Sequence, residues 1–187
     1  YAEIDDKAGR LASWLKSVGV KNGDVVSFQM PPWSEFCILY VACLKVGAVC
    51  HPLPVTFNGE DLVYSMNLVE SKAFICPTFH HKTNFEDQFL SVKDKITSLL
   101  DGAFCVHDKT VESHGTITLN EIFETFEPLK EAPESNSDEI VLILSTSGTT
   151  GRPKAVLISH NALIFSEKTF IKSLHLTRQD VMFMPAP

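Results

Sequence analysis

The chain has 187 residues, of which 44% are hydrophobic and 21% are charged, so it can bury a substantial core and is neither fibrous nor disordered by composition. Its formal net charge of -7 gives no basic surface of the kind that nucleic acids require, and we expect no nucleic-acid partner. The longest apolar stretch, residues 36–54, is interrupted by Lys45 and His51, whereas a bilayer span needs about 20 largely uncharged residues. We therefore expect a core segment and no transmembrane helix, which leaves peripheral contact with a membrane open.

The predicted elements alternate between amphipathic or apolar helices and short apolar strands. In chain order they are a helix at 5–17, a strand at 25–30, a helix at 33–46, a strand at 48–53, a helix at 60–70, a strand at 73–76, a helix at 88–100, a strand at 103–106, a helix at 119–126, strands at 140–144 and 155–158, and a helix at 161–171. This alternation predicts an α/β fold built from right-handed βαβ units, with a mostly parallel sheet covered by helices.

The five cysteines are an odd number in apolar surroundings and include no C-x-x-C pair. They are Cys37, Cys43, Cys50, Cys76 and Cys105. This pattern favours reduced, buried thiols over metal ligands or disulfides. The first residues also lack the basic start and apolar run of a secretory signal, so we expect a cytoplasmic protein. Because the chain does not begin with Met, we expect it to start within a longer protein.

Residues 126–139 carry two prolines and several Glu, Ser and Asn residues without periodicity, which predicts an exposed connection. The strand predicted at 140–144 is continuously apolar, and we expect it to be buried on both faces. Directly after it comes segment 145–154, which reads STSGTTGRPK.

Segment 145–154 is predicted to bind phosphate. Backbone N–H groups and hydroxyls in such a glycine-containing loop can converge on phosphate oxygens, and Lys154 adds a positive charge. The candidate ligands are Thr146, Ser147, Gly148, Thr149, Thr150, Gly151 and Lys154. The alternative to a phosphate-binding loop is a Ser/Thr/Gly-rich surface turn that binds no ligand. Such turns rarely lie between two apolar strands with a Pro-Lys pair at a fixed distance after the glycines.

The more familiar motifs with related composition are absent. The segment has neither the G-x-x-x-x-G-K-[ST] spacing nor G-x-G-x-x-G, and Ser145 occupies the place of the first glycine in a G-x-S-x-G nucleophile elbow. The string TSGTTGRPKAV, followed by Ser159-His160, instead resembles the signature loop of the adenylate-forming (AMP-binding) superfamily. That superfamily includes acyl-CoA synthetases, 4-coumarate-CoA ligases, luciferases and peptide-synthetase adenylation domains. The chain departs from it at Ala155, where the family usually has Gly, a change that fits a negative φ.

The resemblance extends over the whole chain, through segments 19–26 and 35–54. Segments 29–36, 40–49 and 182–187 look most like bacterial short- and medium-chain fatty acyl-CoA ligases. The resemblance implies that residues 1–187 form part of a large N-terminal AMP-binding domain. The adenine contacts, an acidic Mg²⁺ ligand, the acyl pocket and a catalytic lysine on a mobile C-terminal domain would all follow residue 187.

The resemblance implies an acid–thiol ligase that uses ATP, Mg²⁺ and coenzyme A to activate a small carboxylic acid, here a fatty acid, through an acyl-adenylate. Ser147 to Gly151 and Lys154 would contact the β- and γ-phosphates, with Lys154 acting in catalysis, and Thr146 would bind the Mg²⁺–phosphate unit. Arg152 is expected to point to solvent. His160 is expected to cap or pack the start of the helix at 161–171. The other histidines, His51, His80, His81, His107, His114 and His175, are expected to be surface or packing residues.

Two alternatives remain at this stage. One is an adenylating enzyme with another acceptor, such as a carrier-protein thiol or, as in luciferases, oxygen. The other alternative is a non-catalytic nucleotide-binding domain that keeps the loop without the chemistry. Residues 1–187 alone are expected to be inactive, because positioning and transition-state stabilisation act as a unit.

Overall fold

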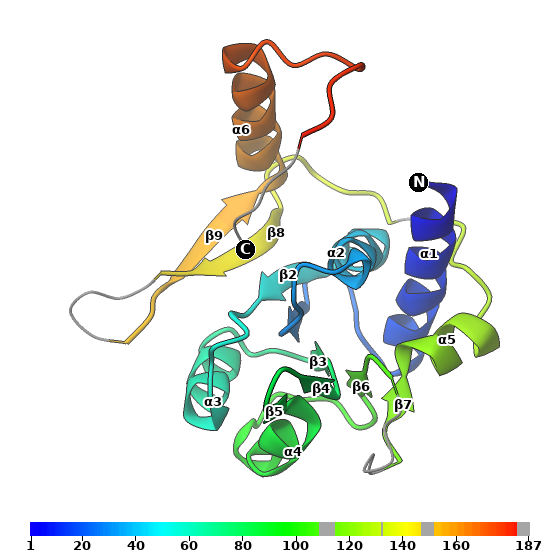
Figure 1. The fold of residues 1–187 in the computed structure, drawn as a ribbon, viewed down its shortest axis with the longest axis vertical. Helices are drawn as coiled ribbons and strands as arrows, with labels where there is room; N and C mark the ends of the chain where they lie inside the picture. The colour runs from blue at the N-terminus through cyan, green and yellow to red at the C-terminus, as the bar shows by residue number, and fades with distance from the viewer. Residues whose placement is uncertain (109–114, 132, 147–151, 183–187) are drawn as a thin grey trace.

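The computed structural model describes residues 1–108, 115–131, 133–146 and 152–182. Its strands, in chain order, are β1 (Val25–Phe28), β2 (Val49–Pro52), β3 (Ala73–Cys76), β4 (Phe79–His80), β5 (Thr83–Asn84), β6 (Phe104–Val106), β7 (Ile117–Thr118), β8 (Ile140–Ser145) and β9 (Ala155–Ser159). A seven-stranded sheet has the order β7-β6-β3-β1-β2-β8-β9, and β4 pairs with β5 in a separate hairpin (Figure 1). Neighbouring strands of the large sheet are parallel except for β8 and β9, which are antiparallel.

Most of the helices cover the two faces of this sheet. The helices are α1 (Ala2–Ser17), α2 (Ser34–Val46), α3 (Gly59–Leu68), α4 (Phe85–Leu90), the short 3₁₀ helix η1 (Lys93–Lys95), α5 (Leu119–Thr125) and α6 (His160–Ser173). One buried cluster joins the sheet to α1, α2 and α5, and a second joins it to α3 and α4. Ile75 belongs to the first and its neighbour Phe74 to the second, as expected from side chains that alternate along a strand. The predicted α/β fold with a mostly parallel sheet is confirmed.

One predicted helix is wrong. Residues 88–100 do not form a continuous helix: α4 starts earlier, where the Asn84 side chain accepts a hydrogen bond from the Asp87 N–H, and it ends at Leu90. Farther on, the Thr97 N–H donates to the Asn67 side-chain oxygen at 3.2 Å, which ties this segment to α3. These capping and tertiary contacts override the helical periodicity. The two-residue strands β4, β5 and β7 are too short for a recognisable pattern and were not predicted.

The strand predicted at 140–144 is buried only in its centre. Val141, Leu142 and Ile143 are buried, but Leu144 is 41% exposed, so the expectation of burial on both faces is wrong at its end. The strand β9 lies at the edge of the sheet, and α6 extends away from the two helical layers (Figure 1). The helix α6 has no buried residue, and its Phe165 is 74% exposed. None of the helices in the described ranges has the length and apolarity needed to cross a bilayer.

The connection predicted at 126–139 has two parts. Its first residues lie against α1, where the Leu129 N–H donates to the Gly9 carbonyl at 2.9 Å and the Ser13 hydroxyl donates to the Glu127 carbonyl at 2.7 Å. A Cβ on Gly9 would lie 2.9 Å from the Pro128 Cβ, so this close approach requires glycine. Residues 133–139 are exposed.

A buried polar pair lies in the centre of the sheet. The His51 ring Nδ1 and the Ser27 hydroxyl are 2.8 Å apart on the neighbouring strands β2 and β1. His51 is only 1% exposed, and burial lowers its pKa from 6.5 to about 4. Burial in the folded chain therefore favours the neutral imidazole, which agrees with the expected packing role.

We predict that this histidine makes stability depend on pH. The unfolded chain protonates His51 near pH 6.5 and the folded chain only near pH 4, so stability falls as the pH falls between these values. Thermal unfolding at a series of pH values should show a flatter dependence in this window for His51→Gln than for the parental protein. His175→Asn, at an exposed position with φ 53°, is the matched control and should keep the parental slope. An unchanged slope in His51→Gln would contradict the assignment.

Candidate functional site: the hairpin between β8 and β9

The predicted phosphate loop connects β8 and β9 in an antiparallel hairpin. The register pairs Leu144 with Val156 and Ser145 with Ala155. One step beyond the last strand pair, the Thr146 N–H donates to the Lys154 carbonyl at 2.9 Å. The Lys154 N–H in turn donates to the Thr146 hydroxyl oxygen at 3.1 Å. Thr146 and Lys154 therefore close the base of the loop, which lies between two strands as the sequence predicted.

Thr146 and Lys154 are the candidate ligands whose positions the structure describes. Both are exposed, so the Thr146 hydroxyl and the Lys154 ammonium are accessible to a ligand. Ser147, Gly148, Thr149, Thr150 and Gly151 lie outside the described residues. Their assignment to the β- and γ-phosphates remains a prediction.

The hairpin leaves the sheet at the edge where the central parallel strands end. β8 runs parallel to β2, which runs parallel to β1, so Ser145, Pro52 and Phe28 end their strands at one edge. An apolar pocket of about 490 Å³ lies there, with Trp33, Phe36, Leu53, Leu144 and Ser145 in its lining. Ligands of open parallel sheets bind outside the carboxyl ends of the strands, so this edge is the expected place for a substrate.

A contact from α3 reaches the other end of the loop. The Tyr64 hydroxyl donates a hydrogen bond to the Pro153 carbonyl at 3.2 Å. The Arg152 guanidinium lies 4.9 Å from the centroid of the Tyr64 ring, a cation–π contact. Arg152 is exposed, as expected, but its charged group lies against Tyr64 instead of pointing freely into solvent. Tyr64 and Lys154 also line a cavity of about 540 Å³ between α3 and the hairpin.

The structure also brings together an aromatic and histidine cluster that the sequence did not reveal. The Trp33 ring lies 5.1 Å from the His107 ring and 5.3 Å from the His80 ring, measured between centroids. His107 Nε2 is 3.6 Å from Glu35 Oε1, and Nδ1 is 3.4 Å from Asp108 Oδ1. The cluster joins three separate segments, at residues 33–35, at His80 and at residues 107–108, so no spacing along the chain could have indicated that these segments meet. Trp33 connects the cluster to the apolar pocket, which it also lines.

His160 and the cysteines offer little to a reaction. Ser159, and not His160, caps α6, because its hydroxyl accepts a hydrogen bond from the Ala162 N–H; His160 is the first residue of the helix. The cysteines are free thiols, and burial raises the pKa of Cys76 and Cys105 well above its usual value, which suppresses the reactive thiolate. Cys37 is exposed, so the expectation that all the thiols are buried is wrong there.

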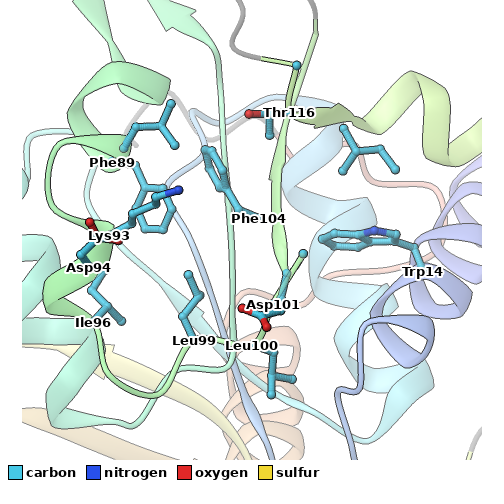
Figure 2. Close-up of a pocket in the computed structure, with 15 residues that line it drawn as sticks. Trp14, Phe89, Lys93, Asp94, Ile96, Leu99, Leu100, Asp101, Phe104 and Thr116 are labelled. Carbon is cyan, nitrogen blue, oxygen red and sulfur yellow. The ribbon is translucent and has the colours of Figure 1, made fainter.

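A larger cavity, of about 860 Å³, lies near the edge of the sheet that is farthest from the hairpin (Figure 2). Figure 2 shows Phe89, Phe104, Leu99 and Trp14 around it, with charged side chains between them. It adjoins β6 and β7, whereas the hairpin is formed by the last two strands at the other end of the sheet order. Neither Thr146 nor Lys154, the predicted site residues that the structure describes, lines this cavity. Its size alone therefore does not make it the candidate site.

A covered parallel sheet with a hydroxyl- and glycine-rich hairpin at its carboxyl edge defines a class of α/β domains that bind ligands at that edge. Within this class the family is shown by comparison with known proteins. The family model described as AMP-binding enzyme matches residues 1–187, and the chain belongs to this family. Its resemblance to the adenylate-forming proteins is thereby confirmed.

Relatives of known name are similar over the whole chain. The medium-chain fatty-acid–CoA ligase of Escherichia coli K12 is 36% identical over 187 residues, which are 100% of this chain and 33% of the ligase. The long-chain fatty-acid–CoA ligase FadD13 of Mycobacterium tuberculosis is 27% identical over 100% of this chain and 35% of its own length. The chain thus spans about a third of the length of the curated relatives it matches.

Solved structures agree with the fold. The ATP-bound structure of MatB from Rhodopseudomonas palustris has a TM-score of 0.79 and 27% identity, covering 96% of this chain and 33% of MatB. The anthranilate CoA ligase AuaEII, solved with anthranoyl-AMP, has a TM-score of 0.79 at 19% identity over 89% of this chain and 31% of its own. At that identity the second likeness supports the fold alone.

Proposed function

We propose that the protein containing this chain is an ATP-dependent acyl-CoA ligase. A carboxylate oxygen of the substrate attacks the α-phosphorus of ATP, the bond from that phosphorus to the β-phosphate oxygen breaks, and pyrophosphate leaves. The thiolate of coenzyme A then attacks the acyl carbonyl of the adenylate, forming the thioester and releasing AMP. The observation that carries this proposal is the loop closed by Thr146 and Lys154 at the carboxyl edge of the sheet.

The proposed substrate is a fatty acid. Support comes from the two relatives named as medium-chain and long-chain fatty-acid–CoA ligases, which match the chain over its full length. The apolar pocket beside Ser145 provides an apolar surface next to the loop, in keeping with substrates that carry an apolar group.

Each loop residue has a role in this proposal. The exposed Lys154 ammonium faces the β- and γ-phosphates, where negative charge accumulates as pyrophosphate departs. Ser147, Gly148, Thr149, Thr150 and Gly151 supply hydroxyl and N–H donors to the same phosphates. None of these residues acts as a nucleophile, because the attacking groups belong to the substrates.

The residues present fit a magnesium ion bound together with ATP. Thr146 is exposed, and among the described residues its hydroxyl oxygen accepts one hydrogen bond, from the Lys154 N–H; a hydroxyl oxygen has a second lone pair that can bind a cation. Mg²⁺ prefers oxygen ligands and commonly takes few of them from the protein and the rest from phosphates and water. When bound, it would supply positive charge to the phosphates of ATP.

The function is tested by two assays on the full-length protein. ATP–pyrophosphate exchange that depends on a fatty acid reports adenylation, and thioester formation that depends on coenzyme A reports the second step. Both are expected. Exchange without thioester formation would indicate an adenylating enzyme with another acceptor, such as a carrier protein or oxygen. ATP binding without exchange would indicate a non-catalytic nucleotide-binding domain.

We predict that the two cationic side chains flanking Pro153, Arg152 and Lys154, contribute unequally to the rate of adenylation. In the full-length protein Lys154→Ala should slow adenylation about 10²- to 10³-fold, because one electrostatic contact to the developing charge is lost. ATP affinity should fall less than this rate. Arg152→Ala should slow adenylation only about 2- to 5-fold, because it removes an exposed cation–π contact with Tyr64. Pre-steady-state pyrophosphate release compares the two variants, and the reverse order of effects would make Arg152 the phosphate ligand.

We also predict that residues 1–187 expressed alone are inactive. Positioning and transition-state stabilisation act together, and the chain spans about a third of the related ligases. ATP–pyrophosphate exchange with octanoate should therefore stay at the level of a protein-free blank. The full-length protein, assayed under the same conditions, is the positive control. Turnover by residues 1–187 alone would show that the active site lies within this chain.

A further inference from the structure

Tyr64 connects α3 to the last residues of the phosphate loop. Its half-buried side chain donates a hydrogen bond to the Pro153 carbonyl, 89 residues later in the chain. The Arg152 guanidinium lies over the same ring, 4.9 Å from its centroid. Tyr64 therefore contacts the two residues directly before Lys154.

The helix that carries Tyr64 is firmly attached to the domain. Leu62 and Met66 of α3 are fully buried in the core cluster on that face of the sheet. Its first turn is fixed by a capping box between Asn58 and Asp61, which satisfies backbone N–H groups that the helix leaves free. Tyr64 thus projects from a firmly packed helix toward residues 152–153 of the loop.

The segment Arg152 to Lys154 is consequently held from two directions. Thr146 pairs with the Lys154 backbone on the hairpin side, and Tyr64 holds the Pro153 carbonyl on the α3 side. A lysine side chain has many rotamers, so its ammonium is placed well only if the backbone that carries it is fixed. Small errors in the position of a charged group lower the reaction rate strongly when that charge must stabilise the transition state.

We propose that Tyr64 is a positioning residue for adenylation. Tyr64 fixes the backbone before Lys154 so that the Lys154 ammonium lies against the departing pyrophosphate. The inference rests on the proposed ligase function. Tyr64 acts through Pro153 and Lys154 and touches no reacting atom. Its loss should affect the step in which pyrophosphate leaves, whereas the reaction of a preformed acyl-adenylate with coenzyme A involves no pyrophosphate.

The test compares Tyr64→Phe and Tyr64→Leu in the full-length protein. Tyr64→Phe removes the hydroxyl that bonds Pro153 and keeps the ring under Arg152, whereas Tyr64→Leu removes both contacts. Tyr40→Phe, at a half-buried tyrosine of α2, is the matched control for loss of a phenol hydroxyl. Each variant is assayed for ATP–pyrophosphate exchange, for thioester formation from synthetic acyl-adenylate, and for its thermal midpoint.

Tyr64→Phe should lower kcat for exchange about 3- to 10-fold, the effect of one hydrogen bond, with a smaller change in KM for ATP. Tyr64→Leu should lower it further. Thioester formation from the preformed adenylate and the thermal midpoint should stay close to parental values in Tyr64→Phe, and Tyr40→Phe should match the parent in both reactions.

Three outcomes would overturn the inference. Exchange by Tyr64→Phe at the parental rate would show that the hydrogen bond does not position the loop. An equal loss in both reactions, together with a lower thermal midpoint, would show that Tyr64 only supports the fold. A parental protein that exchanges no pyrophosphate would overturn the proposed function itself, and this inference with it, which separates that result from the other two.

Discussion

The candidate site depends on the closure of one hairpin. The strands β8 and β9 pair up to Ser145 and Ala155, and Thr146 and Lys154 add two more hydrogen bonds beyond them. These bonds restrict the backbone of Thr146 and Lys154, so the entropy cost of ordering these two residues does not fall on ligand binding. The threonine hydroxyl has a structural task here as well as the proposed ligand task, because it accepts the Lys154 N–H.

The remainder of the fold gives this hairpin its place. The antiparallel pair begins from a strand, β8, that is parallel to β2, so the loop emerges where β1 and β2 also end. The two buried clusters on opposite faces hold these strands in place, and α3, packed in one of them, reaches the loop through Tyr64. A polyphosphate site built in this way has a rigid base, although its ligands lie on a loop.

Much of the fold could be predicted because its signals are local. Apolar runs, a glycine directly after the helix predicted at 33–46 and the hydroxyl-rich segment after an apolar strand are all readable in the sequence, and in the structure that glycine, Gly47, ends α2 with a φ of 79°. The prediction of a helix at 88–100 was wrong because the Asn84 cap and the hydrogen bond from the Thr97 N–H to Asn67 outweigh the helical periodicity of the apolar residues. The contacts of Tyr64 with Arg152 and Pro153, and of Trp33 with His80 and His107, join distant segments, so no pattern in the sequence contains them.

In the proposed function, ATP binds at the hairpin and not in the larger cavity beside β6. Hydrogen–deuterium exchange of the full-length protein, with and without ATP and Mg²⁺, compares the two places directly. Binding at the hairpin should slow exchange in the peptide that contains Thr146 and Lys154 and leave residues 89–104, which border the cavity, unchanged. Protection of residues 89–104 with no change around Thr146 and Lys154 would contradict it.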